Sequence, residues 1–346
     1  MLRIFHNTTY DFIKPWRIMV TATVVFIVIG ISSLIFNGIR YSIDFTGGTL
    51  IQLQFVQPPD VGRLRSAFDR GGVHDAEIQA FGSNREFTVR AQNVAKANVQ
   101  TGGADSVARQ VSTILDKEFG PTAYRVVRTE AVGPRVGSEL RRNALIAILI
   151  SFGVTLLYLA IRFEWRFGVA ADLATAHDIL TTLAFIKLMN IEVSLTVVAA
   201  ILTVIGYSMN DTIIIFDRVR ENLRRRRKEP LYDTLNRSVN ETLPRSVMTH
   251  ATALAATIAL LLFAGEVIRP FAWVMAFGIV TGTFSSIYVA APVLLWIERR
   301  WPRDAEQRAT AKAGSQRAPE AAGRAAKDAA TEAAKGPAKG SVAPTR

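Results

Sequence analysis

The sequence predicts an α-helical polytopic membrane protein that carries one α+β domain outside the membrane. Hydrophobic residues make up 49% of the 346 residues, a high share for a soluble protein. Several apolar segments are each near the length that crosses a bilayer. One long polar stretch, with alternating strand and helix patterns, separates the first apolar segment from the second. Together these features favour a membrane-embedded helix bundle with a single water-exposed domain.

Six segments have the length and composition of transmembrane helices, because about 20 apolar residues cross the hydrocarbon core. The predicted spans are 18–36, 144–161, 168–189, 193–216, 247–265 and 271–297. The first is followed by no small-residue cleavage site, so we predict an uncleaved anchor. The third contains four charged or titratable residues. It is retained because omitting it would place Arg162 and the basic run 224–227 on opposite sides of the membrane.

The basic residues predict the orientation of these spans. They gather at one set of loop ends, at Lys14, Arg17, Arg162, Arg166, 218–228 and 299–303. The positive-inside rule then places both termini in the cytoplasm of a multi-pass protein of the cell (inner) membrane. The chain is thereby divided into an N-terminal segment with the first helix (1–37), a periplasmic domain (38–141), helices two to six (142–302) and a cytoplasmic tail (303–346).

The polar stretch predicts a compact α+β domain. Residues 49–56 alternate apolar and polar side chains, as a half-buried strand does, and Asp60 can cap a helix that ends at Gly71-Gly72. Two short strands follow at 77–81 and 86–91. A second helix begins near Asp105 or Ser106 and ends at Gly120-Pro121, before a last strand at 124–129. The order β-α-β-β-α-β is that of a ferredoxin-like domain.

Composition excludes several classes of function. The chain has no cysteine, so disulfides and thiol catalysis are excluded, and it has no H-E-x-x-H or Walker-type motif. We therefore expect no metal, no cofactor and no enzymatic activity. The net charge of +12 comes from basic residues at the ends of apolar segments, so we expect contact with membrane lipid and not with nucleic acid. The tail is rich in Ala, Lys, Arg, Gly and Pro, and we predict disorder there.

Ionisable residues inside the predicted spans are the candidate functional residues, because a charge in hydrocarbon is costly unless it has a partner, water or a proton. The fourth span contains Asn210-Asp211, and the third contains His177-Asp178. Arg245 immediately precedes the predicted fifth span. Further polar side chains are expected at the same depth, at Tyr207, Ser208, Thr249, His250 and Thr252. Carboxylates and imidazoles in such a bundle are suited to a proton relay.

Each candidate also has a structural interpretation. Asp211 could form a permanent ion pair with Arg245, and Asp178 with His177 could fix helix packing through interhelical hydrogen bonds. Two facing aspartates could also act as an intramembrane protease, but the predicted depths of Asp178 and Asp211 differ by several ångströms, which disfavours this. The small residues Gly278, Gly282 and Ser286 recur every four positions and predict close helix packing. Gly47-Gly48 predicts only a special backbone geometry.

Several longer motifs resemble one family. These are 41–55 (YSIDFTGGTLIQLQF), 132–140 (VGPRVGSEL), 157–167 (LYLAIRFEWRF), His177-Asp178, 206–222 (GYSMNDTIIIFDRVREN) and 285–290 (SSIYVA). In this order they resemble the SecF family of protein-export membrane proteins. Residues 174–176 are smaller and more polar than the resemblance would suggest. The resemblance implies an RND-type half-module whose six helices pair with six helices of a SecD partner.

The resemblance also implies a function and a set of partners. Proton flow into the cell would move the periplasmic domains of a SecDF complex, beside the SecYEG channel and with YajC, and so promote the translocation of preproteins. It assigns the intramembrane acid to Asp211 and its cooperating base to Arg245. Two other functions stay open, an RND-like exporter half for small molecules and a structural scaffold of the translocon.

The energetics suggest that one proton is not sufficient. A proton that crosses an assumed potential of roughly 150 mV releases on the order of 3.5 kcal/mol. Moving a two-state element from 1:99 to 99:1 needs about 5.5 kcal/mol. We therefore expect a contribution from the pH gradient or a second proton, for which His177-Asp178 is the candidate acceptor.

Overall fold

The computed structural model describes residues 8–73, 76–91, 103–226 and 229–302, and in these ranges six helical segments are long and apolar enough to cross a membrane. They are α1 (Trp16–Asn37), α6 (Pro134–Arg162), α7 (Trp165–Leu188), α8 (Leu195–Arg225), α9 (Leu231–Phe263) and a last segment made of α10 (Arg269–Ser285), the π-helix η1 (Ser286–Ala290) and α11 (Ala291–Arg300). The predicted six-helix membrane architecture is confirmed. The first compact unit ends at Leu294, and the predicted tail 303–346 lies outside the described residues.

Each helix extends beyond its predicted apolar segment at one end or both, although α7, α8 and α9 each fall one or two residues short at the other end. The largest difference is in α9, which begins at Leu231 and not near residue 247. Thr249 and His250 therefore lie in the middle of a helix and not at its start. The added turns are polar and contain Pro244, so the apolar pattern of the sequence did not predict them as part of the helix. Some of their polar side chains, such as Ser238 and Asn240, are buried.

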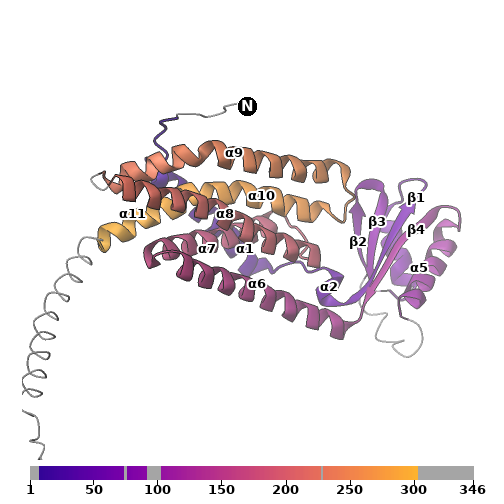
Figure 1. The fold of residues 1–346 in the computed structure, drawn as a ribbon. Coiled ribbons are helices and arrows are strands. Elements are labelled where there is room, and N and C mark those ends of the chain that lie inside the picture. The colour runs from indigo at the N-terminus through magenta and orange to yellow at the C-terminus, as the bar shows by residue number, and fades with distance from the viewer. Residues whose placement is uncertain (1–7, 74–75, 92–102, 227–228, 303–346) are drawn as a thin grey trace, which may run out of the picture. The chain divides into compact units, whose positions relative to one another are not determined.

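The six membrane helices differ in their burial. More than half of the apolar stretch is buried in α7, in α8 and in the last segment, whereas only 6% of it is buried in α1 and in α6. Figure 1 shows α10 beside α9 and α8. A Cβ added at Gly278 would come within 2.2 Å of Val204, and one at Gly282 within 2.9 Å of Ser208. The predicted small-residue stripe is therefore a close contact between α10 and α8. The exposed apolar faces of α1 and α6 are suited to lipid or to a partner helix.

The polar stretch folds as predicted into an α+β domain. Its elements are β1 (Gly48–Phe55), α3 (Val61–Arg70), β2 (Glu77–Phe81), β3 (Ser83–Ala91), α5 (Gly103–Phe119) and β4 (Tyr124–Val132). The sheet is antiparallel, with the order β2-β3-β1-β4 (Figure 1). This is the split β-α-β arrangement of a ferredoxin-like domain. The core lies between the sheet and the two helices, with Ile51, Leu53, Leu64, Phe68 and Leu115 fully buried.

Local signals set these boundaries. The Asp60 carboxylate accepts hydrogen bonds from the backbone N–H groups of Gly62 and Arg63, and so caps α3. β3 begins at Ser83, three residues earlier than predicted, because β2 and β3 form a hairpin that turns at Gly82, where φ is +75°. β4 continues to Val132, which pairs with Gly48 at the start of β1.

Candidate functional site

Asp211 lies inside the helix bundle with one oxygen bonded and one oxygen unpaired. It sits on α8 and is 2% exposed. Its Oδ1 accepts a hydrogen bond of 2.5 Å from the Ser246 hydroxyl of α9. The Ser286 hydroxyl lies beside the same carboxylate, but its hydrogen bonds go to Thr212 Oγ1 at 2.8 Å and to the Gly282 carbonyl at 2.9 Å. Oδ2 is therefore buried without a hydrogen-bond partner among the described residues.

Asp178 is buried as deeply as Asp211 but has more hydrogen bonds. It lies on α7 and is 1% exposed. Its Oδ2 accepts hydrogen bonds from the hydroxyls of Ser208 on α8 and Ser285 on α10, the latter at 2.7 Å, and its Oδ1 lies 3.1 Å from His177 Nδ1. Asp178 thus joins three helices. The second ring nitrogen of His177, Nε2, is buried without a partner in the described part of the chain.

The two carboxylates are separated by a layer of hydroxyls. Ser285 bonds Asp178, and the next residue, Ser286, lies against Asp211. Consecutive helical residues point about 100° apart, so one turn of the last segment reaches both acids. The π-helix η1 begins at Ser286. Such π-bulges widen a helix by one residue and are frequent at functional sites.

Arg245 and Asn210 do not join this layer. Both side chains are exposed, and neither makes an ion pair or hydrogen bond within the described ranges. The predicted ion pair between Arg245 and Asp211 is therefore absent here, because it is the next residue, Ser246, that points at the carboxylate. His250, one turn further along α9, is close enough to interact electrostatically with Asp211, and its ring packs edge-on against Tyr207 at 5.4 Å.

The carboxyl groups of Asp178 and Asp211 have separate hydrogen-bond partners. Each has its own set of hydroxyl donors, and no hydrogen bond joins the two carboxyls among the residues described. This is not the geometry of an aspartyl protease, in which two carboxylates meet directly. The arrangement is a row of polar side chains in which hydroxyl groups lie between the two acids, and apolar helices enclose this row.

The segment that leads into the α+β domain is attached to the N-terminal end of α8. Asp44, in the short helix α2 (Ile43–Thr46), accepts a hydrogen bond of 3.0 Å from the backbone N–H of Leu195, the first residue of α8. Tyr41 and Val193 form an isolated parallel β-bridge beside it. No local sequence signal predicts this contact, because its two halves are about 150 residues apart.

Gly47-Gly48 has a definite structural role in the same place. Both residues have positive φ, +72° and +120°. A Cβ added at Gly137, near the start of α6, would lie 2.9 Å from the Gly47 nitrogen. The backbone of the motif therefore packs directly on α6, and a side chain at position 137 would separate them.

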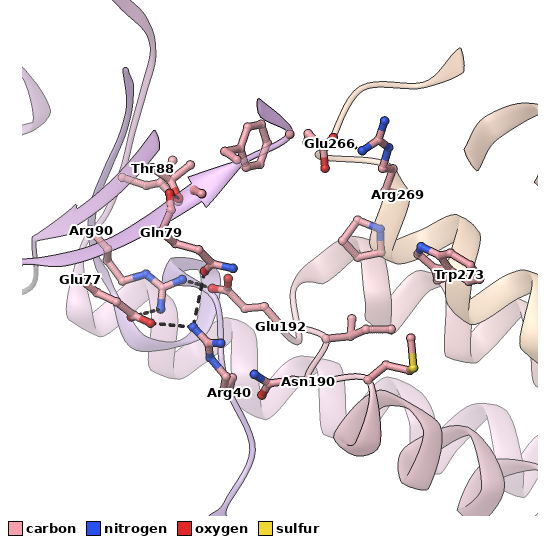
Figure 2. A pocket seen from close by; sticks show the side chains of 17 residues that line it. Arg40, Glu77, Gln79, Thr88, Arg90, Asn190, Glu192, Glu266, Arg269 and Trp273 are labelled. Carbon is pink, nitrogen blue, oxygen red and sulfur yellow. Dashed lines mark hydrogen bonds and ion pairs between the residues drawn. The ribbon is translucent and has the colours of Figure 1, made fainter. Parts of the chain in front are cut away.

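A polar cleft lies between the sheet and the ends of the membrane helices that are nearest to the α+β domain. Figure 2 shows Arg40, Glu77, Arg90 and Glu192 converging at one end of it. Arg90 of β3 makes an ion pair with Glu192, in the loop between α7 and α8, and Arg40 pairs with Glu77 at 2.7 Å. The cavity is about 410 Å³. Burial lowers the pKa of Arg90, and the Glu77 carboxylate acts in the opposite sense.

Comparison with known proteins identifies the family. Residues 111–300 match the family model of the C-terminal part of the protein-export membrane proteins SecD and SecF, and residues 32–59 match the SecD/SecF GG motif. The chain is 62% identical over 315 residues to the protein translocase subunit SecF of Gemmatimonas aurantiaca, which covers 90% of this chain and 94% of that protein. It belongs to the SecD/SecF family of protein-export membrane proteins. Gly47-Gly48, which packs against α6, lies in the GG motif of this family.

Other members agree with this assignment. The SecF subunit of Pseudomonas aeruginosa is 38% identical over 289 residues, 84% of this chain and 92% of that protein. The crystal structure of SecDF from Thermus thermophilus, described as a translocon-associated membrane protein, matches with 37% identity and a TM-score of 0.75. The match covers 85% of this chain and 39% of the SecDF chain. The chain is thus a SecF-type subunit of the protein-export machinery and a multi-pass membrane protein.

Proposed function

We propose that this SecF-type subunit works with a SecD partner to couple proton flow into the cell to the outward movement of preproteins. In this proposal both termini are cytoplasmic, the α+β domain is periplasmic, and SecYEG and YajC are further partners. The solved SecDF chain is more than twice the length matched here, which supports a partner that supplies the remaining half. The chain acts as an accessory transport subunit and not as an enzyme.

One observation carries this proposal, the unpaired Oδ2 of Asp211. A buried carboxylate oxygen without a donor is unfavourable while it is charged, and it is relieved when a proton binds. Asp178 has donors on both oxygens, so it is better suited to holding α7, α8 and α10 together. We therefore assign the proton carrier to Asp211. His177, with its buried free nitrogen beside Asp178, remains the candidate for a second proton.

The same helix connects the acid to the periplasmic domain. Asp211 lies sixteen residues along α8 from Leu195, which is about 24 Å at 1.5 Å per residue. At Leu195 the helix is capped by Asp44, at the root of the domain. A change in the position of α8 on protonation would therefore displace the attachment of the domain. The ion pair between Arg90 and Glu192 would break or re-form in the same movement.

The exposure of Arg245 and Asn210 supports a location for the SecD partner. Both are exposed at the level of the buried acid, and exposing them to lipid would be unfavourable. We propose that the SecD helices cover this face and bring Arg245 into the polar layer in one state of the cycle. Arg245 would then stabilise the charged form of Asp211, as the resemblance implies.

The test is the export activity of Asp211→Asn in the assembled complex. The substitution preserves the shape and removes the titratable group, so stimulation of preprotein translocation by the membrane potential should be lost while the complex assembles normally. Asp217→Asn is the matched control, because it makes the same change on the same helix at an exposed ion pair with Arg162. Full stimulation in Asp211→Asn would leave only a scaffolding role for the subunit.

A further inference from the structure

A second cavity, at the outer end of the membrane bundle, is lined almost entirely by apolar side chains. Its volume is about 590 Å³, within the ~300–1,000 Å³ range of ligand-binding pockets. It lies between α6, α7 and α8. Its apolar walls are formed by Ala144, Leu145, Ile148, Leu183, Val198 and Ile201. Neither the GG motif nor the acidic layer of the bundle accounts for this cavity.

One end of this cavity is positively charged. Ser138, Arg141 and Arg142, on successive turns of α6, line it just before the apolar stretch of that helix begins. The guanidinium of Arg141 lies 5.1 Å from the centre of the Tyr41 ring. Arg142 makes no ion pair or hydrogen bond in the part of the chain that the structure describes. Among the described residues no carboxylate lines the cavity, so two positive charges face it without compensation.

These arginines lie at an unusual place for a membrane protein. In the proposed topology α6 enters the membrane from the periplasmic side, where lysine and arginine are normally scarce. A pair of arginines at the membrane boundary favours binding of an anion. A phosphate group supplies one, because guanidinium binds phosphate through paired, charge-assisted hydrogen bonds.

We propose that this cavity holds an anionic phospholipid of the outer leaflet. Its phosphate would lie at Arg141 and Arg142, within reach of the Ser138 hydroxyl, and an acyl chain would extend along the apolar wall toward Ile148. On the cytoplasmic side of membranes, basic pockets between transmembrane helices bind anionic headgroups in the same way. Charge complementarity favours a lipid over a helix of a partner subunit, since an apolar helix would leave both guanidinium groups unpaired.

The site also adjoins the root of the periplasmic domain. Tyr41 and Phe45, on either side of Asp44, line the same cavity. A bound lipid would fill the space beneath this segment and brace it against α6 and α8. The lipid would thus act as a structural ligand of the segment that joins the domain to the bundle.

The test uses the complex with its partner in nanodiscs of phosphatidylcholine that contain a photoactivatable phosphatidylglycerol. Mass spectrometry should find the label on α6 peptides around 144–148. The double variant Arg141→Gln/Arg142→Gln should reduce that labelling by at least about fivefold, since each basic residue contributes to anionic-lipid affinity. Arg135→Gln is the matched control, because this arginine lies on the same helix but outside the cavity, and its labelling should match that of the unmodified complex.

Two further measurements keep the proposal falsifiable. Ala144→Phe fills the cavity and keeps both arginines, so it should lose the label even if the double variant fails to assemble. A photoreactive amino acid placed at Leu145 should crosslink to lipid. A crosslink to the partner subunit would instead overturn the proposal, and so would equal labelling in all variants or by photoactivatable phosphatidylcholine, which would indicate ordinary annular lipid.

Discussion

Removing the Asp44 carboxylate should loosen the outer end of α8. Asp44 accepts the hydrogen bond of the Leu195 N–H, which at the first position of the helix has no other partner among the described residues. Ser194 already caps the third position through its bond to Val197. Asp44→Ala therefore removes one cap and one negative charge from the helix N-terminus, and leaves the Ser194 cap intact.

The size of the effect follows from these two contributions. Loss of a capping side chain costs about 0.5–2 kcal/mol, and loss of a charge near a helix N-terminus costs about 0.3–1 kcal/mol. A local destabilisation of about 1–2 kcal/mol corresponds to a change of roughly 5–30-fold in the population of the open state. Asp44→Asn keeps an acceptor oxygen and loses only the charge, so its effect should be a few-fold.

Hydrogen exchange of the complex, followed by mass spectrometry, measures this directly. Amides 195–198 should exchange about 5–30-fold faster in Asp44→Ala. Exchange of the amides around 41–43 should also become faster, because the Ser42 N–H donates a hydrogen bond to the Val193 carbonyl, just before α8. Asp60→Ala removes a cap of the same kind from α3 and should accelerate exchange only there. Exchange at 195–198 within twofold of the unmodified complex would refute the proposed link.

Three further perturbations test other contacts. Gly278→Ala should destabilise the purified complex by about 1–3 kcal/mol through overpacking against α8, whereas Gly206→Ala, at an open position, should leave its thermal stability unchanged. A double-mutant cycle with Arg90→Gln and Glu192→Gln should give a coupling energy of about 0.5–3 kcal/mol, and additive effects would contradict the ion pair. Tyr124 titrates with a pKa raised to about 12, chiefly by burial. Its neutral form is therefore favoured in the folded state, so this contribution to stability is present below pH 10 and is lost as the pH rises toward 12. The ultraviolet absorbance of the phenolate, as the difference between the unmodified protein and Tyr124→Phe, should show the late titration.

The sequence predicted most of the fold because its signals are local. Apolar runs define the membrane helices, and the alternation in 49–56 defines β1, since both periods can be read over a few residues. The start of α9 was not predicted, because this part of the helix is stabilised by residues far away in the sequence. Asn240 there exchanges two hydrogen bonds with the backbone of Tyr10, and such a contact has no local signature.

The sequence predicted the two acids of the candidate site but not the hydroxyl groups that bind them. Asp211 and Asp178 stand out because carboxylates are rare in apolar helices. The hydroxyls that complete the layer, such as Ser246 and Ser285, are common in membrane helices and carry no signal of their own. The family resemblance pairs Arg245 with Asp211, and the two were expected at similar depth. Depth does not fix the rotation of a helix, in which one residue moves a side chain by about 100°.

The central claim is that Asp211 gains and loses a proton while it is buried in the bundle. Infrared difference spectroscopy of the assembled complex, with the unmodified protein compared with Asp211→Asn, tests it most directly. The account predicts one carboxylic-acid band that changes with pH in the unmodified complex, is absent from Asp211→Asn and persists in Asp217→Asn. A carboxylate that stays ionised at every pH at which the complex remains assembled would contradict the account.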